Sequence, residues 1–184
     1  GKLQYIYSNR LNLGQVRTEE NVFWSLAPHD ISIFQYFTDS FPEKVHASGS
    51  SFLQENIYDS TLTQLKYRNG VEGHIFVSWL HPFKEHRLVV IGSEGMISFE
   101  DSSEGKPLKL YAKKFNMEQG IPEKIDGPVT LVNYEQKMAL TEELLYFSNH
   151  LNNKVPKVAN GQHALQVMRI LIEASEQLEN NENK

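Results

Sequence analysis

The side chains best suited to chemistry lie between Ser8 and Ser32, in the stretch SNRLNLGQVRTEENVFWSLAPHDIS. Two guanidinium groups, several amides and an imidazole gather there, between a strand-like segment and an apolar helix. Guanidinium groups suit diphosphate and carboxylate groups, because they donate paired, charge-assisted hydrogen bonds. An imidazole is the usual proton acceptor near neutral pH. These residue types suit the binding of a polar or anionic ligand and the transfer of a proton.

His29 is the candidate base. Ser25 lies four residues before it, which places both side chains on one helical face if Pro28 leaves that turn intact. A serine hydroxyl can hydrogen-bond an imidazole, but it does not stabilise an imidazolium as a carboxylate does. Asp30 points about 100° away on a helix and is a poor substitute. The alternative is that His29 only begins a helix and bonds the backbone, with no catalytic role.

Arg10, Asn12 and Arg17 form the second candidate group. The two guanidinium groups suit a diphosphate or a carboxylate, and the Asn12 amide suits hydroxyl or acetamido groups. The alternative is a solvated loop in which Arg17 pairs with Glu19 or Glu20.

The remaining side chains indicate neither metal nor thiol chemistry. The chain has no cysteine, which excludes disulfides and thiolate ligands. Six further histidines lack the spacing of metal ligands, and we expect them to be structural or surface residues: His46, His74, His81, His86, His150 and His163. We therefore predict no metal site.

Length and charge narrow the class of protein. A chain of 184 residues suits one domain. Its 18 Lys and Arg against 23 Asp and Glu give a net charge of −5, which disfavours non-specific binding to nucleic acid or anionic membranes. No apolar run approaches the ~20 residues of a membrane span, and no signal peptide is visible. We expect a cytoplasmic protein that binds neither nucleic acid nor membrane.

The apolar pattern predicts an α+β fold. A helical region covers Phe23 to Phe37, with a bend or a new start at Ala27–Pro28, because proline lacks the N–H that a helix interior needs. Two later helices carry apolar stripes over Leu140–Leu151 and Ala164–Ser175. Alternating or apolar runs predict strands over Leu3–Asn9, Thr61–Arg68, Val71–Leu80, Arg87–Ile91, Met96–Glu100, Leu108–Lys113 and Val129–Tyr134.

Turn residues and surface aromatics predict how these elements assemble. Asn69–Gly70 and Gly92–Gly95 predict hairpins, whereas Phe115–Gly127 predicts a loop. We expect an open, mainly antiparallel sheet of about six strands with helices packed on one face. The other face is then an oligomer interface, unless loops and termini cover its aromatic side chains, which are Tyr67, Phe76, Trp79, Phe99 and Tyr111.

Three ordered segments resemble one family. The stretch Ser8–Ser32 resembles the opening of its substrate-binding domain, and VVIGSEGMISFED (Val89–Asp101) is similar to a strand, turn and strand common there. VPKVANGQHALQVMRILIEA (Val155–Ala174) is similar to its last helix, with Asn160–Gly161 where the family often has Asp-Gly. Over nearly all of Leu3–Gln177 the chain resembles the C-terminal domain of Gfo/Idh/MocA oxidoreductases, most of all the 3-dehydrogenases of UDP-N-acetylglucosamine or its uronate.

The resemblance implies hydride transfer from a nucleotide-linked sugar to NAD or NADP. It implies that His29 is the base, in the place of the family's Asp-x-x-x-His, where Ser25 replaces the Asp. It further implies that Arg10, Asn12, Arg17 and Ser25 bind the sugar nucleotide. We expect His29 and the two arginines to line one concave surface.

The resemblance also implies that a nucleotide-binding half is missing. The chain has no GxGxxG after a strand, and Gly1 rather than Met begins it. We expect residues 1–184 to be a single C-terminal substrate-binding and oligomerisation domain, inactive alone, whose N-terminal Rossmann domain holds the cofactor. No cofactor-binding residue is assigned in this chain, and the whole protein is expected to be a homo-dimer or homo-tetramer. The alternative is a non-catalytic structural or ligand-binding module that retains the fold.

Overall fold

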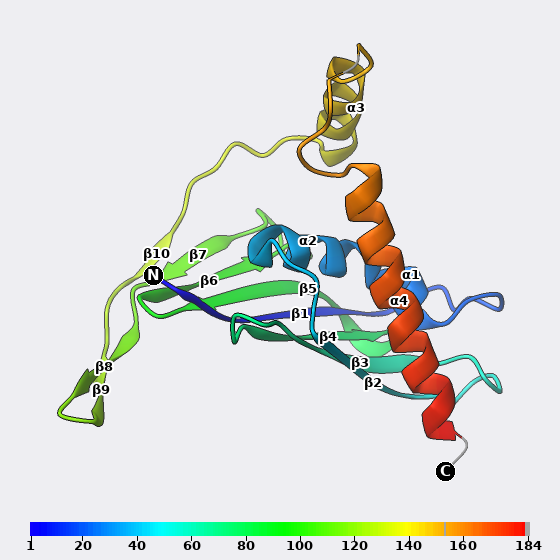
Figure 1. Cartoon of the computed structure of the whole chain (residues 1–184), viewed down its shortest axis with the longest axis horizontal. Helices are drawn as coiled ribbons and strands as arrows, with labels where there is room; N and C mark the ends of the chain where they lie inside the picture. Colours follow the sequence, from blue (N-terminus) through cyan, green and yellow to red (C-terminus); the bar gives the residue numbers. More distant parts are fainter. Residues whose placement is uncertain (153, 183–184) are drawn as a thin grey trace.

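The computed structural model, which describes residues 1–152 and 154–182, confirms the α+β class (Figure 1). The described residues form one open sheet whose strands are β1 (Leu3–Leu13), β2 (Lys44–Ser50), β3 (Ser60–Lys66), β4 (Glu72–Ser78), β5 (Leu80–Gly92), β6 (Gly95–Glu100), β7 (Leu108–Tyr111) and β10 (Val129–Leu131). Their order is β10-β7-β6-β5-β1-β4-β3-β2. Neighbouring strands are antiparallel except β1 and β4, which run parallel, so the sheet is mainly antiparallel as predicted.

The sheet has eight strands rather than the predicted six or so. The strand without any sequence signal is β2, an edge strand of sequence KVHASGS in which only Val45 and Ala47 are buried. Small and polar residues fill its other positions, so its alternation is too weak to be recognised before its partner is known.

A separate two-stranded hairpin replaces the loop predicted over Phe115–Gly127. Strands β8 (Lys114–Glu118) and β9 (Ile121–Ile125) pair across Gln119 and Gly120, whose φ angles are 52° and 84°. Its apolar side chains are exposed rather than set against a core, with Phe115 62% and Ile121 70% exposed. The pairing therefore rests on the turn and the backbone, which the sequence pattern did not reveal.

Both predicted hairpins are confirmed. Gly70 has a φ of 83° in the turn between β3 and β4, and the Val71 carbonyl accepts a hydrogen bond from the Tyr67 N–H at 2.9 Å. Strands β5 and β6 pair directly up to Gly92 and Gly95.

Proline divides the first helical region as expected. Helix α1 (Val22–Leu26) begins at Asn21, whose Oδ1 accepts hydrogen bonds from two backbone N–H groups of the first turn. Helix α2 (Pro28–Thr38) starts afresh with Pro28 in its first turn, where the missing N–H costs nothing. The later helices are α3 (Ala139–Asn149) and α4 (Gly161–Glu182). None of the described helices has the length and apolar content needed to cross a bilayer.

The core lies between the sheet and helices α1, α2 and α4, which Figure 1 shows over one face. Ile6 and Ile75 from the sheet are fully buried with Phe34 from α2 and Ile170 from α4. Gly73 lets the Phe34 ring approach β4, because an added Cβ would lie 2.8 Å from that ring.

Two of the five aromatic side chains expected on the other face belong to this core. Tyr67 is 1% exposed and Trp79 is 2% exposed, so neither is available to an interface. Both stand in short connections at strand ends, Tyr67 in the β3–β4 turn and Trp79 between β4 and β5, where strict alternation no longer sets the side-chain direction.

Buried Asp59 ties together three segments at one end of the sheet. Its Oδ1 accepts from Trp79 Nε1 at 2.6 Å, and its Oδ2 accepts from the backbone N–H groups of Phe52 and Leu53 at 2.6 and 2.9 Å. The residue is fully buried. This carboxylate therefore holds the β2–β3 loop against the start of β5.

We expect Asp59→Asn to lower the free energy of unfolding by about 1–3 kcal/mol. The asparagine NH₂ group would replace one accepting oxygen and would face N–H donors with which it cannot form a hydrogen bond. Urea denaturation measures the change. Asp126→Asn is the matched control, since Asp126 is exposed and bonded to Lys124, and it should change stability by less than about 1 kcal/mol. Equal effects of the two substitutions would contradict the structural role of Asp59.

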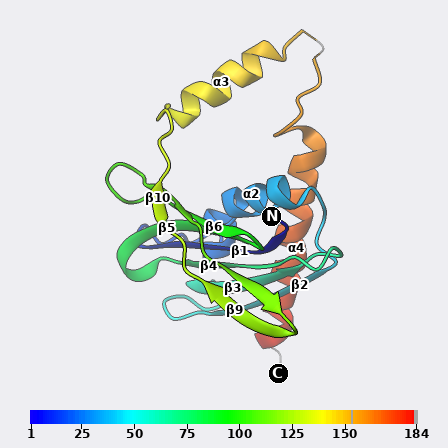
Figure 2. The ribbon, with the colours of Figure 1, turned by 90° about the vertical axis from the view of Figure 1, so that its left-hand side faces the viewer.

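Helix α3 stands apart from the rest of the fold. Both views in Figures 1 and 2 show it away from the sheet, and none of its residues is buried. Its exposed apolar side chains are Leu140, Leu144, Leu145 and Phe147. Such a helix has an apolar surface without a partner among the described residues.

Candidate functional site

His29 lies in the first turn of α2, at the rim of a hollow of about 540 Å³ between α2 and α4. We call this the His29 hollow; Trp24, Ser32 and Ile33 line it from the α1–α2 side, and His163, Val167 and Met168 line it from α4. The His29 side chain is exposed, and among the described residues no hydrogen-bond partner is found for it. Its imidazole is therefore free to meet a ligand.

Ser25 lies one helical turn before His29, in α1. It is half-buried, and within the described part of the chain its hydroxyl has no hydrogen-bond partner. No carboxylate contacts His29 in that part of the structure either. Asp30, the nearest acid in the sequence, points elsewhere, as its angle on the helix predicted.

Half-buried Arg10 and buried Asp30 form an ion pair between β1 and the first turn of α2. Arg10 Nε donates to Asp30 Oδ2 at 2.9 Å, and Arg10 Nη2 donates to Oδ1 at 3.3 Å. The side chains are 18% and 5% exposed. Two donors of the guanidinium group are thus used within the protein, and the pair fixes the helix end that carries His29.

Asn12 lies near the end of β1, and Arg17 lies in the connection from β1 to α1. Arg17 is exposed and lines a hollow formed only by residues 15–20, while its carbonyl oxygen accepts from Gln54 Nε2 at 2.9 Å. The alternative ion pair with Glu19 or Glu20 does not form among the described residues. Asn12 is half-buried.

The structure does not bring His29, Arg10 and Arg17 to one concave surface. His29 and Arg17 line different hollows, and Arg10 is turned onto Asp30. The two hollows share no lining residue, a separation that residue spacing alone does not reveal.

His163 is the residue of the His29 hollow that sequence reasoning missed. Its Nε2 lies 2.8 Å from the Ser32 Oγ, across the gap between α4 and α2. The sequence held one signal for its place: Asn160 caps α4, and its Oδ1 accepts from the His163 N–H at 2.9 Å. That signal fixes the helix start but not the neighbour that the imidazole meets.

His86 is a second titratable group near the ion pair. It lies opposite Arg10 in the pairing of β1 with β5, and its Nε2 is buried without a partner among the described residues. Burial, followed by the nearby Arg10 and Lys84 charges, lowers the pKa of His86 below its usual value. The imidazole is therefore largely neutral at pH 7.

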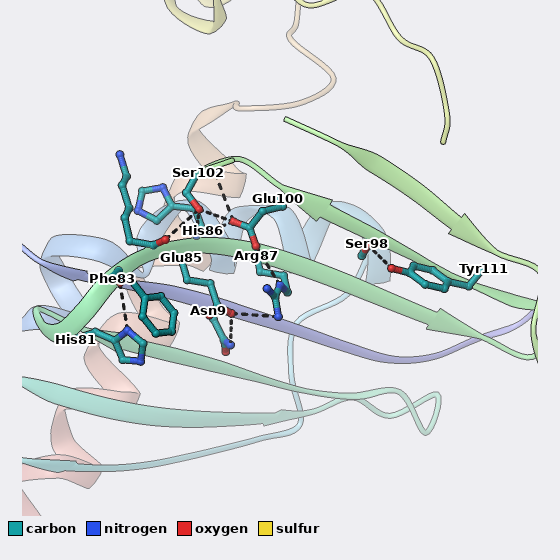
Figure 3. Close-up of polar contacts among 11 residues, drawn as sticks. Asn9, His81, Phe83, Glu85, His86, Arg87, Ser98, Glu100, Ser102 and Tyr111 are labelled. Carbon is teal, nitrogen blue, oxygen red and sulfur yellow. Dashed lines mark hydrogen bonds and ion pairs between the residues drawn. The ribbon is translucent and has the colours of Figure 1, made fainter. Parts of the chain in front are cut away.

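The other face of the sheet carries a connected polar array (Figure 3). Arg87 contacts Glu100 at 3.0 Å and Glu85 at 3.5 Å, and Asn9 Nδ2 donates to Glu85 at 2.8 Å. Burial raises the pKa of Glu100, but hydrogen bonds from Ser102 and Arg87 outweigh it and hold this pKa below its usual value. A hollow of about 480 Å³ lies over this array.

A further aromatic group lies on the same face, where β1 meets β4. The His74 ring stacks on Tyr7 at 5.1 Å, and its Nδ1 lies 2.6 Å from the Tyr5 hydroxyl. Burial lowers the pKa of His74. No group of histidine, aspartate and glutamate side chains suited to a metal ion occurs among the described residues.

Residues 8–98 match the family model of the GFO/IDH/MocA C-terminal domain. No curated protein matches the chain.

Solved structures share its fold. UDP-N-acetylglucosamine 3-dehydrogenase GnnA from Acidithiobacillus ferrooxidans is similar with a TM-score of 0.82 and 19% identity, over 98% of this chain and 56% of that chain. The aldose-aldose oxidoreductase from Caulobacter crescentus, complexed with glycerol, has a TM-score of 0.73 and 17% identity, over 96% and 54%. The WlbA dehydrogenase from Bordetella pertussis, in complex with NADH and UDP-GlcNAcA, has a TM-score of 0.69 and 14% identity, over 98% and 54%.

The chain thus spans about half the length of these proteins. At such identities the likeness to them concerns the fold, whereas the family model matches the sequence itself. Both agree with the resemblance found in the three ordered segments. By the match over residues 8–98, the chain belongs to the GFO/IDH/MocA family and carries its C-terminal domain.

Proposed function

We propose that this chain is the substrate-binding and oligomerisation domain of a cytoplasmic, NAD(P)-dependent oxidoreductase that oxidises a nucleotide-linked sugar. Membership of the GFO/IDH/MocA family supports the oxidoreductase class. The names of GnnA and of the WlbA complex support the substrate class. The observation that carries the proposal is the unpaired His29 imidazole at the rim of a hollow large enough for a sugar ring.

His29 takes the proton of the sugar hydroxyl whose carbon is oxidised. An imidazole accepts such a proton when it lies within hydrogen-bond reach of the hydroxyl. Buried Asp30 and Arg10 hold the helix turn from which His29 projects, so the imidazole is presented by a fixed backbone. Ser25, one turn earlier, is assigned a hydrogen bond to the sugar.

The cations near the β1–α1 connection bind the nucleotide part. Arg17 is exposed and its guanidinium group is unpaired among the described residues, so it can donate to a diphosphate without losing a protein partner. Asn12 offers an amide to hydroxyl or acetamido groups. Arg10 contributes with the Nη1 donors that Asp30 leaves free.

The cofactor belongs to a further domain rather than to this one. The connection from β1 to α1 contains one glycine, Gly14, so it does not form the glycine-rich cradle that a dinucleotide needs. We therefore assign NAD or NADP to an N-terminal Rossmann domain, and we derive no step of cofactor binding from these residues. The GnnA chain extends well beyond the part that this chain matches, which supports such a domain.

Two helices supply the docking surface for that domain. Helix α3 exposes Leu144 (58%) and Phe147 (64%), and α4 exposes Leu165 (55%), Met168 (42%) and Ile172 (47%). The α4 residues recur at helical spacing on the side away from its buried stripe, so α4 has a second apolar face. Apolar surface of this extent favours a protein partner.

The face of the sheet opposite the helices is assigned to self-association. It carries Tyr5, Tyr7 and His74 beside the Arg87 array, a mixture of aromatic and charged groups. Aromatic residues and arginine are the side chains enriched at protein interfaces. A dimer or tetramer built on this face would also cover the apolar atoms that the monomer leaves exposed.

The test is turnover by the polypeptide encoded by the whole natural gene. We expect it to reduce NAD⁺ or NADP⁺ only when UDP-N-acetylglucosamine or its uronate is added, whereas residues 1–184 alone reduce neither cofactor. Reduction by residues 1–184 alone would contradict the assignment of the cofactor to another domain. A whole gene product that reduces neither cofactor with any nucleotide sugar contradicts the enzymatic proposal.

A non-catalytic module that retains the fold is the second candidate. One observation favours it: among the described residues no carboxylate contacts the His29 imidazole, and Ser25 stands where the family has an acid. This candidate predicts that the whole gene product binds a nucleotide sugar in calorimetry and oxidises none.

A further inference from the structure

The first turn of α4 brings a second imidazole to the His29 hollow. His163 lines this hollow from α4, while His29 lines it from α2. The two histidines are separated by most of the chain in sequence, and they line one hollow because α4 packs across α2, as Figure 1 shows. A hollow with two imidazoles on opposite walls has more hydrogen-bonding capacity than His29 alone supplies.

Ser32 lines the same hollow and contacts one of its two imidazoles. It follows His29 by three residues in α2, so both side chains lie on the same helical face. Its Oγ lies 2.8 Å from His163 Nε2. A hydroxyl both donates and accepts, so Ser32 can bond His163 and still donate to, or accept from, a ligand.

Neighbouring contacts fix the positions of this pair. Asn160 Oδ1 accepts from the His163 N–H at 2.9 Å, which sets the first turn of α4. One turn further along both helices, Gln35 Nε2 donates to Gln166 Oε1 at 3.1 Å. Trp24 Nε1 donates to Ser175 Oγ at 2.8 Å, so the Trp24 side chain is tied to α4 as well. Both walls are therefore anchored on either side of the Ser32–His163 contact.

The hollow suits an uncharged group. Its lining residues include no lysine, arginine, aspartate or glutamate. The Trp24 indole donates its N–H to Ser175. The polar side chains of the lining that can still bond a ligand are therefore those of His29, Ser32 and His163. A diphosphate needs cationic partners, whereas a sugar ring needs apolar walls and a few hydroxyl contacts.

We propose that Ser32 and His163 complete this site: His163 is a positioning residue that orients the Ser32 hydroxyl, and Ser32 contacts the same sugar hydroxyl or carbonyl as His29. This inference rests on the proposed function. It assigns the reacting sugar ring to the His29 hollow and leaves the diphosphate to residues outside it. When His163 Nε2 carries the proton, the Ser32 O–H is free to donate to the oxygen from which His29 has taken the proton.

The test measures kcat and KM of the whole gene product with UDP-N-acetylglucosamine. Ser32→Ala and His163→Ala should each lower kcat/KM about tenfold, as expected for one lost hydrogen bond to the reacting group. The double variant should be no worse than either single one, because both substitutions remove one shared contact. Ser32→Thr keeps the hydroxyl and should retain most of the activity.

His46→Ala is the matched control, since His46 is an exposed histidine on β2 and should keep wild-type kcat and KM. A purely structural role predicts a lower thermal midpoint with unchanged kcat/KM for the folded enzyme, and that result overturns the inference. Wild-type kcat/KM in His163→Ala, beside an inactive His29→Ala, overturns it while the proposed function stands. A whole gene product that oxidises no nucleotide sugar overturns both.

Discussion

His29→Ala lowers kcat of the whole gene product by about 10²- to 10⁴-fold, the usual contribution of a positioned general base. The imidazole is exposed at the rim of the hollow and has no partner among the described residues. The other imidazole of the hollow, His163, contacts Ser32, so the variant lacks the imidazole assigned to take the proton. The expected loss falls on kcat rather than on KM, because the diphosphate contacts are made elsewhere. Steady-state reduction of NAD⁺ or NADP⁺ measures the change.

His46→Ala controls for the general effect of losing a surface imidazole, and it should retain wild-type kcat. A His29→Ala variant with wild-type kcat would falsify the base assignment. His163, the other imidazole of the His29 hollow, would then be the next one to replace.

Arg10→Ala lowers the free energy of unfolding by about 3–5 kcal/mol, because it leaves the Asp30 carboxylate buried without its cation. The same substitution loosens the first turn of α2, from which His29 projects. Urea denaturation of residues 1–184, followed by circular dichroism, measures the loss.

Lys66→Ala is the matched control, since Lys66 pairs with Glu72 at 3.0 Å while the two side chains are 55% and 52% exposed. This substitution should lower the free energy of unfolding by no more than about 1 kcal/mol. If Arg10→Ala costs as little as Lys66→Ala, the Arg10–Asp30 pair does not anchor α2.

The sequence predicted correctly those turns and helix boundaries that depend only on the residues at that position. Asn69–Gly70 specifies its turn whatever surrounds it, and Pro28 divides the helical region because a missing N–H cannot be supplied by any neighbour. Strand β2 and the β8–β9 hairpin were missed for the opposite reason. Strand β2 forms because it pairs with β3, and the β8–β9 hairpin forms around a turn that lacks the Asn-Gly signal. Neither shows the alternation of apolar and polar residues by which a strand is recognised.

The site was predictable only within a single segment. The spacing of Ser25, His29 and Asp30 on one helical stretch follows from helix geometry, and Asp30 does point away from His29. The partner of Asp30 on β1 and the arrival of His163 from α4 depend on packing between distant segments, which periodicity does not encode. The burial of Tyr67 and Trp79 was not predictable either, because both lie at strand ends, where alternation no longer sets the side-chain direction.

The free-standing helix α3 has a thermodynamic consequence for assembly. Its 11 residues are fewer than an isolated helix needs to be stable in water, and no buried side chain compensates. Its amide hydrogens should therefore exchange with solvent as readily as those of a short peptide until a protein surface covers its apolar side. The free-energy cost of ordering this segment would then reduce the net free energy gained by contact with that surface.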